Sequence, residues 1–175
     1  MATSRLIQKI FASDESGVGE DSIAVSDRRQ VEKFRILAVG SGDTQTVEAG
    51  DIVALKVDAA SAGEIGFSVA KSAADKHCIG VAITGGTGTT NAASAVTAAP
   101  LIDVCISGIA SAKVKGANNA GNATIAAGDF LCQGDVAGVL YKFTAGTDAM
   151  VHAIALEAQS SGTTGLKSVM FISQF

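Results

Sequence analysis

The sequence predicts an all-β protein, a compact β-barrel or sandwich, preceded by an N-terminal arm that contains short helices. Three observations lead to this class. Short apolar runs recur from Ile36 onward, glycine-containing turns separate them, and the apolar content of 47% comes from small side chains, since aromatic residues make up only 5%. The gaps between runs are short and poor in helix formers, which argues against alternating strands and helices. The 175 residues suffice for one domain plus an arm.

Residues 1–35 form the predicted arm, because their composition differs from that of the remaining chain. They hold 12 of the 30 charged residues and all four arginines. Apolar spacing predicts one short helix over 6–11, and a cap-like Ser-Asp pair predicts another over 26–34, with Val31 and Phe34 on one face. These apolar patches either pack onto the β domain of the same chain or dock onto a neighbouring chain.

Residues 36–175 form the predicted β-rich domain. Eight apolar runs are expected to be strands: Ile36–Val39, Ile52–Val57, Ile65–Val69, Ile79–Ile83, Leu101–Ile109, Val136–Phe143, Val151–Leu156 and Leu166–Ile172. Residues 84–99 interrupt the series. Their small, polar side chains cannot build a core, which predicts a long exposed loop with one helical turn near 92–98.

A short motif occurs twice in this domain. Gly50-Asp51 and Gly128-Asp129 each precede an apolar run, and a small apolar strand introduced by His77 or His152 follows further along the chain. The echo predicts two related β units packed together. Each Asp, like Asp135 of a third pair, Gly134-Asp135, is expected to accept hydrogen bonds from nearby backbone N–H groups in a turn, rather than to serve as a catalytic carboxylate.

The sequence contains no recognisable catalytic, cofactor-binding or metal-binding motif. It therefore predicts no catalytic residue, no cofactor and no metal ligand, and a protein that is not an enzyme. GxSxG and HExxH are absent, and the glycine-rich stretch 85–90 lacks the lysine of a phosphate loop. The histidines are expected at strand starts on a solvent edge. The three cysteines, Cys78, Cys105 and Cys132, form no CxxC pair and are expected to be buried small hydrophobes in a protein made in a reducing cytoplasm.

Charge and hydropathy indicate which classes of partner the protein is expected to bind. The net charge of −4 and the scarcity of aromatics argue against a nucleic-acid partner, which would call for a basic stripe with stacking rings. No apolar run approaches the roughly 18 residues of a membrane helix, and no signal-peptide pattern is expected at the N-terminus. Nucleic acid and membrane are therefore not among the expected partners.

The order of motifs over residues 48–172 resembles that of small decoration, or cement, proteins of tailed-bacteriophage heads. The matching pieces are the turn 49–51 with its strand, Ile79-Gly80-Val81-Ala82, Gly108, the turn 126–129, Ile154-Ala155-Leu156-Glu157-Ala158, and the apolar end 169–172. The arm lies outside the match, and the 84–99 loop is an apparent insertion. The resemblance implies a β-tulip-like, often trimeric protein on the outer capsid surface, with the major capsid protein and further copies of itself as partners.

The resemblance implies a structural virion protein that is made in the host cytoplasm and stabilises the assembled capsid. The alternative is a glycan-binding or host-contact appendage on a β scaffold. Such sites usually present Trp or Tyr, whereas this chain has no Trp and only Tyr141. The candidate protein–protein interface lies in the arm, because arginine and aromatic residues are enriched at interfaces. Its residues are Arg5, Phe11, Arg28, Arg29, Phe34 and Arg35.

Overall fold

The computed structural model describes residues 29–36, 44–55, 68–72, 77–89, 100–118, 121–122, 124–145, 148, 150–160 and 162–172. The described part is all-β and contains no helix. Its strands are β1 (Gln30–Ile36), β2 (Thr44–Val47), β3 (Ile52–Leu55), β4 (Ser68–Lys71), β5 (Cys78–Ala82), β6 (Gly86–Thr89), β7 (Leu101–Lys115), β8 (Ala117–Asn118), β9 (Gly121–Asn122), β10 (Phe130–Gln133), β11 (Leu140–Lys142), β12 (Ala153–Ala155) and β13 (Thr164–Phe171).

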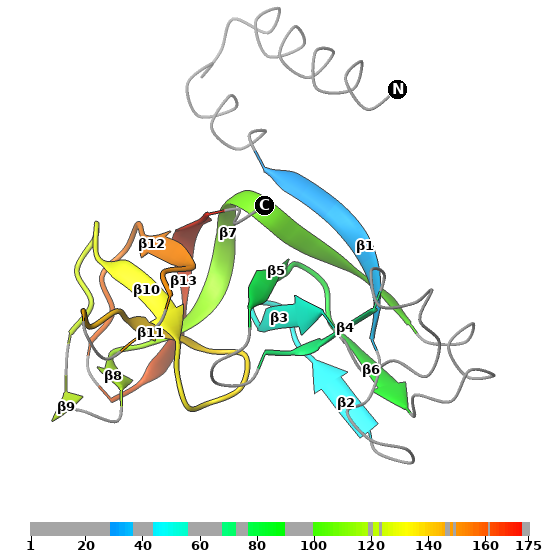
Figure 1. Ribbon diagram of the computed structural model, residues 1–175, viewed down its shortest axis with the longest axis horizontal. Helices are drawn as coiled ribbons and strands as arrows, with labels where there is room; N and C mark the ends of the chain where they lie inside the picture. The colour runs from blue at the N-terminus through cyan, green and yellow to red at the C-terminus, as the bar shows by residue number, and fades with distance from the viewer. Residues whose placement is uncertain are drawn as a thin grey trace, which may run out of the picture.

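Nine of these strands close into two five-strand circuits that share β7. The hydrogen-bonded order is β1-β4-β3-β5-β7-β11-β10-β12-β13, and two further pairings, β1–β7 and β7–β13, close the rings. We call β1-β4-β3-β5-β7 the first barrel and β7-β11-β10-β12-β13 the second barrel. Figure 1 shows them as two lobes, with the long strand β7 running from one to the other. Two short ribbons, β2–β6 and β8–β9, complete the described fold.

The two barrels repeat one another in register. Val53 pairs with Gly80 and Lys71 in the first barrel, as Leu131 pairs with Ala153 and Lys142 in the second. Extending this alignment through the remaining strand pairings places β12 in the position of β5, β11 in that of β4, and β13 in that of the first half of β7. The second half of β7 matches β1, since each pairs in parallel with the strand that follows in its ring. The predicted pair of related β units is therefore present.

Gly108 stands where β7 passes from one barrel to the other. Its φ of 101° lies in the left-handed region that favours glycine. Before it, β7 pairs with β1 and β5, and from Gly108 onward it pairs with β13. The positive φ lets a single 15-residue strand bend enough to belong to both rings.

Each barrel has its own apolar interior. Side chains from all five strands fill the first: Ile36, Val53, Val69, Ile79, Ala82, Ile102 and Val104, together with Val47. The interior of the second includes Ala110, Ala112, Val114, Leu131, Leu140, Ala153, Ala155, Val169 and Phe171, together with Ile125. The small side chains noted in the sequence suit such narrow barrels, whose interiors hold only a few side chains per layer.

Three sequence predictions need correction. The helix predicted over 26–34 is wrong from Gln30 onward, because these residues form β1, which pairs with β7 along its length. The last residues of the predicted arm thus close the first barrel. The loop predicted over 84–99 is wrong over 86–89, where β6 pairs with β2, and its remainder from 90 to 99 lies outside the described residues, as does the helix predicted over 6–11.

Each of the eight predicted runs overlaps a strand. Ile36–Val39 does so only at Ile36, since 37–39 lie outside the described residues, and Val136–Phe143 and Val151–Leu156 are shortened to β11 and β12. Val136–Val139 forms a turn before β11. The strands β2, β6, β8, β9 and β10 lie outside the predicted runs. Among the residues that the structure describes, no helix is long and apolar enough to cross a membrane.

Candidate interaction surface

The first barrel carries a surface that the second barrel covers, which we call the internal junction. Three backbone hydrogen bonds cross it. The N–H of Lys113 donates to the carbonyl of Gly50 (2.8 Å), Ile52 donates to Gly138 (2.9 Å), and Gly138 donates to Ser72 (2.8 Å). The turn before β11 therefore lies against β3 and β4, and β7 lies against the Gly50-Asp51 turn.

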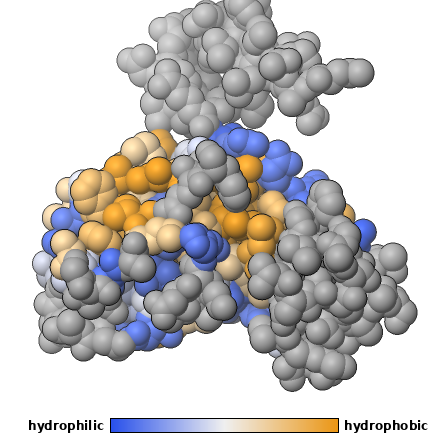
Figure 2. Space-filling model, in the orientation of Figure 1, coloured by the Kyte–Doolittle hydropathy of each residue, from blue (hydrophilic) through white to orange (hydrophobic). Residues whose placement is uncertain are grey.

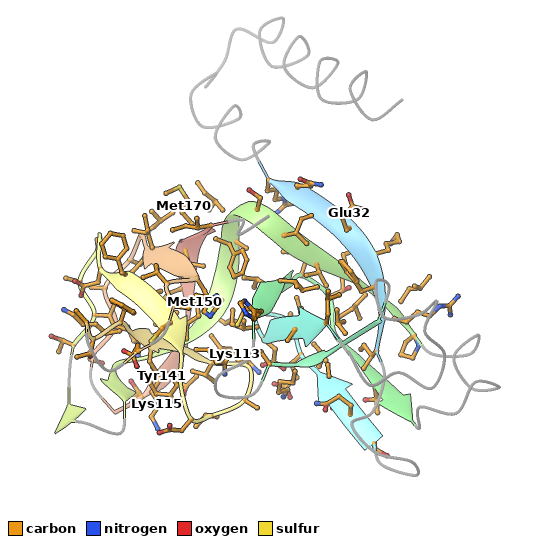
Figure 3. All side chains as sticks on the ribbon, in the orientation of Figure 1. Glu32, Lys113, Lys115, Tyr141, Met150 and Met170 are labelled. Atoms are coloured by element: carbon orange, nitrogen blue, oxygen red, sulfur yellow. The ribbon has the colours of Figure 1, made fainter. Side chains whose placement is uncertain are left out.

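Asp51 is the charged centre of the internal junction. Its side chain is 1% exposed and accepts a hydrogen bond from the backbone N–H of Glu48 (2.8 Å). Its carboxylate also pairs with Lys71 of the first barrel (2.9 Å) and Lys113 of the second (2.8 Å), and Lys113 additionally bonds Glu48. Figure 3 shows Lys113 between the two lobes. One buried carboxylate thus joins both barrels electrostatically.

The pKa values in this cluster follow from its contacts. Burial alone would lower the pKa of Lys113, but its bonds to Asp51 and Glu48 together outweigh burial and raise the pKa. The bond to Lys113 in turn lowers the pKa of Glu48. Both shifts favour the charged forms, so Lys113 and Glu48 form an ion pair at neutral pH. It resembles a structural ion network rather than a proton-transfer site.

The apolar part of the internal junction consists of Ile52, Val81 and Cys105, all fully buried. Their strand neighbours Val53 and Val104 point into the first barrel, so these three side chains point to its outside. They group with the interior cluster of the second barrel, and Ile83 packs against the same cluster. The second barrel thus removes this outer face of the first barrel from water.

The second barrel carries the same turn, and no described part of the chain covers it. Asp129 accepts a hydrogen bond from the N–H of Ala126 (2.8 Å), as Asp51 does from Glu48, and pairs with Lys142 (2.7 Å), the equivalent of Lys71. The bond to Lys142, followed by that to Ala126, lowers the pKa of Asp129. Its side chain is 23% exposed, and a Cβ placed on Gly128 would meet no atom within 4 Å. The turn hydrogen bonds expected for Asp51 and Asp129 are therefore confirmed, the first in a covered turn and the second in an open one.

The outer apolar face is likewise repeated and exposed on the second barrel. The equivalents of Ile52, Val81, Cys105 and Ile83 are Phe130, Ile154, Met170 and Leu156. We call these four the open patch. Phe130 is 53% exposed, Leu156 40% and Met170 39%, and Ile154 is half-buried. Figure 2 shows apolar residues gathered over this barrel, and Figure 3 places Met170 on its rim. Contiguous apolar surface of this kind marks contact sites.

The residues predicted for an arm interface fall in different places. Arg29 is exposed, Arg35 is half-buried in β1, and Phe34 packs against the interior of the first barrel. Phe34 therefore supports the alternative in which its patch packs onto the chain's own β domain. Arg5, Phe11 and Arg28 lie outside the described residues.

Sequence reasoning missed both the open patch and the Asp51 cluster. The lysines gave one usable signal, because Lys113 interrupts the small apolar run Ala110–Val114 and Lys71 follows Val69-Ala70. Lys113 alternates with the interior residues Ala112 and Val114, so it points away from the interior of the second barrel, where a carboxylate partner is expected. Which carboxylate it reaches depends on the packing of the two barrels, which the motif spacing does not show.

The buried thiols and His152 offer little reactivity. All three cysteines are buried, as predicted, and burial raises the pKa of Cys78 to about 11 and that of Cys132 to about 12, so both are protonated at neutral pH. His77 is exposed as expected, but His152 is only 3% exposed, which corrects its predicted place at a solvent edge. Across the described ranges, no group of three or more His, Cys, Asp or Glu side chains could hold a metal ion.

No family model matches the sequence, and no curated protein matches it. Function is therefore argued from the residues and the fold alone.

Proposed function

We propose that this chain is a structural virion protein that binds the outer surface of an assembled phage capsid and stabilises it, with the major capsid protein and other copies of itself as partners. The carrying observation is that the motif series that resembles the decoration proteins is built into both barrels. Its two Gly-Asp turns occupy equivalent positions in the two rings, as do its strand residues 79–82 and 154–155, while 169–171 match the first half of β7. Two repeated barrels with glycine turns and an exposed apolar patch suit a protein that acts by binding other protein surfaces.

Several features are consistent with this role. The charged cluster at the internal junction is paired and partly buried, the thiols are protonated, and the most exposed large apolar side chains lie on barrel surfaces. A protein that binds only the assembled shell stabilises it by mass action, and many copies multiply a modest contact energy. The homotrimer and the β-tulip-like arrangement that the resemblance implies belong to the same proposal.

The appendage alternative loses its main candidate residue. Tyr141 is 2% exposed and packs over Gly134, where a Cβ would meet its ring at 2.1 Å. A buried ring cannot stack on a sugar, and Trp is absent. The outcome of the following experiment still separates the two functions.

Particles that lack this protein are expected to assemble but to release DNA at a lower temperature than complete particles. Even about 1.4 kcal/mol per contact changes a local opening equilibrium tenfold. DNA release is measured against temperature by dye fluorescence, with particles re-decorated by purified protein as the control. Identical release curves together with lost adsorption to host cells would contradict the cement role and favour the appendage.

Deleting residues 1–28 is expected to weaken attachment to capsids while leaving both barrels folded. The truncation stops at 28 because Gln30–Ile36 forms β1, which closes the first barrel. Arg5, Phe11 and Arg28 are removed, and Arg29 is kept. Attachment is measured by co-sedimentation with undecorated capsids at increasing protein concentration, and far-UV circular dichroism checks the fold. Unchanged affinity of the folded truncation would exclude the arm from the interface.

A further inference from the structure

The internal junction is an interface between two surfaces, one on each barrel. Its first side is the outer face of the first barrel around Gly50 and Asp51. Its second side belongs to the second barrel and includes Lys113 and Leu166, since Lys113 bonds Gly50 and Asp51 and a Cβ on Gly50 would meet Leu166 at 2.3 Å. Because the barrels are repeats, each side has an equivalent on the other barrel.

The equivalent of the first side is the open patch with Gly128 and Asp129. The four apolar positions of the internal junction, three of them fully buried, recur there as Phe130, Ile154, Leu156 and Met170, of which three are more than a third exposed. The same turn, the same carboxylate and the same apolar positions thus occur twice, and only the first occurrence is covered.

The equivalent of the second side lies on the first barrel at Arg35 and Leu101. Arg35 precedes Ile36, which pairs in parallel with Val69, just as Lys113 precedes Val114, which pairs in parallel with Leu140. Arg35 also pairs with Leu101 as Lys113 pairs with Leu166. The leucines are alike in exposure, Leu101 at 55% and Leu166 at 58%.

We propose that two copies of this chain associate head to tail, with the open patch of one copy on the Arg35–Leu101 face of the next, in the arrangement that the internal junction already shows within one chain. Arg35 would approach Asp129 as Lys113 approaches Asp51, and Leu101 would lie over Gly128 as Leu166 lies over Gly50. The contact buries apolar side chains against one another and brings a cation to a carboxylate, so the two faces are complementary in hydropathy and in charge.

Such a contact joins two different surfaces, and therefore either closes into a ring or continues as a filament. In a ring of copies, the barrels would follow one another in a continuous series. Junctions between the two barrels of one chain would alternate with junctions between neighbouring chains. The proposal follows from the internal junction and does not depend on capsid binding. A chain that self-associates but binds no capsid would refute the proposed function and leave this inference standing.

The first test uses one substitution on each face, Phe130→Asp and Leu101→Asp. Each alone is expected to turn a wild-type oligomer into a monomer, with self-association weakened about 30-fold or more. Phe130→Asp places a charge among the apolar side chains of the open patch, and Leu101→Asp places a carboxylate next to Asp129 of the neighbouring copy. Val136→Asp is the matched control, since Val136 is 47% exposed, is apolar and belongs to neither face. Sedimentation velocity measures the oligomer, and circular dichroism checks each fold. Leu156→Asp replaces Phe130→Asp if that variant does not fold.

Mixing the two monomeric variants gives the sharper test. Phe130→Asp leaves the Arg35–Leu101 face intact, and Leu101→Asp leaves the open patch intact, so the mixture is expected to form a one-to-one dimer and nothing larger. A contact of open patch with open patch predicts instead that Leu101→Asp assembles like the wild type. That result, or a wild type that remains monomeric at high concentration, would overturn the proposal.

Discussion

Asp51→Ala is expected to lower the free energy of unfolding by about 3 kcal/mol, and Asp129→Ala by about 1 kcal/mol. The two residues occupy equivalent turns and make equivalent bonds to a backbone N–H and to a strand lysine. They differ in surroundings, because Asp51 is 1% exposed and holds Lys113 as well, whereas Asp129 is 23% exposed. Denaturant unfolding of the two variants measures the difference.

The physical reason is the state in which each substitution leaves its lysines. Removing one partner of a buried ion pair leaves an uncompensated charge, which costs about 3–5 kcal/mol when the site is closed to water. Lys71 and Lys113 are 23% and 21% exposed, so partial hydration places the expected loss near the lower end. Lys142 is 38% exposed and returns to water once Asp129 is gone, leaving mainly the lost turn bond.

Asp51→Asn separates the turn from the charge. The amide oxygen can still accept the bond from the Glu48 N–H, so a loss close to that of the alanine variant would assign the effect to the two lysines. Equal losses for Asp51→Ala and Asp129→Ala would contradict the structural role assigned to the internal junction.

The sequence predicted the strands better than their assembly. Alternating short apolar runs and glycine turns are local signals, so the all-β class and most strand positions follow from them. The helix predicted over 26–34 was wrong from Gln30 onward because Val31 and Phe34 fit a helical face as well as a strand, and only pairing with Leu101–Ser107 decides between them. Tertiary pairing overrode local spacing there.

The repeat shows what short motifs can and cannot predict. Gly-Asp followed by an apolar run revealed the duplication because a turn with positive φ constrains its residues: Gly50 and Gly128 have φ of 87° and 91°. The outer positions carry no such constraint, and Ile52 and Phe130 both read as ordinary strand residues. Ile52 is buried and Phe130 is exposed because the second barrel lies over the first of these positions. No local sequence pattern encodes where that barrel lies.

Lowering the pH from 7 to 4 is expected to destabilise the wild type by about 3 kcal/mol more than the variant His152→Ile. Burial, with a smaller contribution from the charge of His77, lowers the pKa of His152 to about 4 from its ordinary value near 6.5. Its Nδ1 is buried and makes no hydrogen bond. The native state therefore holds the imidazole neutral over a pH range in which the unfolded chain binds a proton.

The sign follows from that difference in bound protons. Between pH 6.5 and 4 the unfolded state binds more protons, so the free energy of unfolding falls as the pH falls, and above pH 7 this residue contributes no slope. His152→Ile is the matched variant because the equivalent position of the first barrel is Ile79, which is 4% exposed. Carboxylates titrate in both proteins, so the informative quantity is the difference between the two unfolding free energies, measured in urea at successive pH values. A difference that stays constant from pH 7 to 4 would show that His152 is protonated as readily in the folded protein as in the unfolded chain.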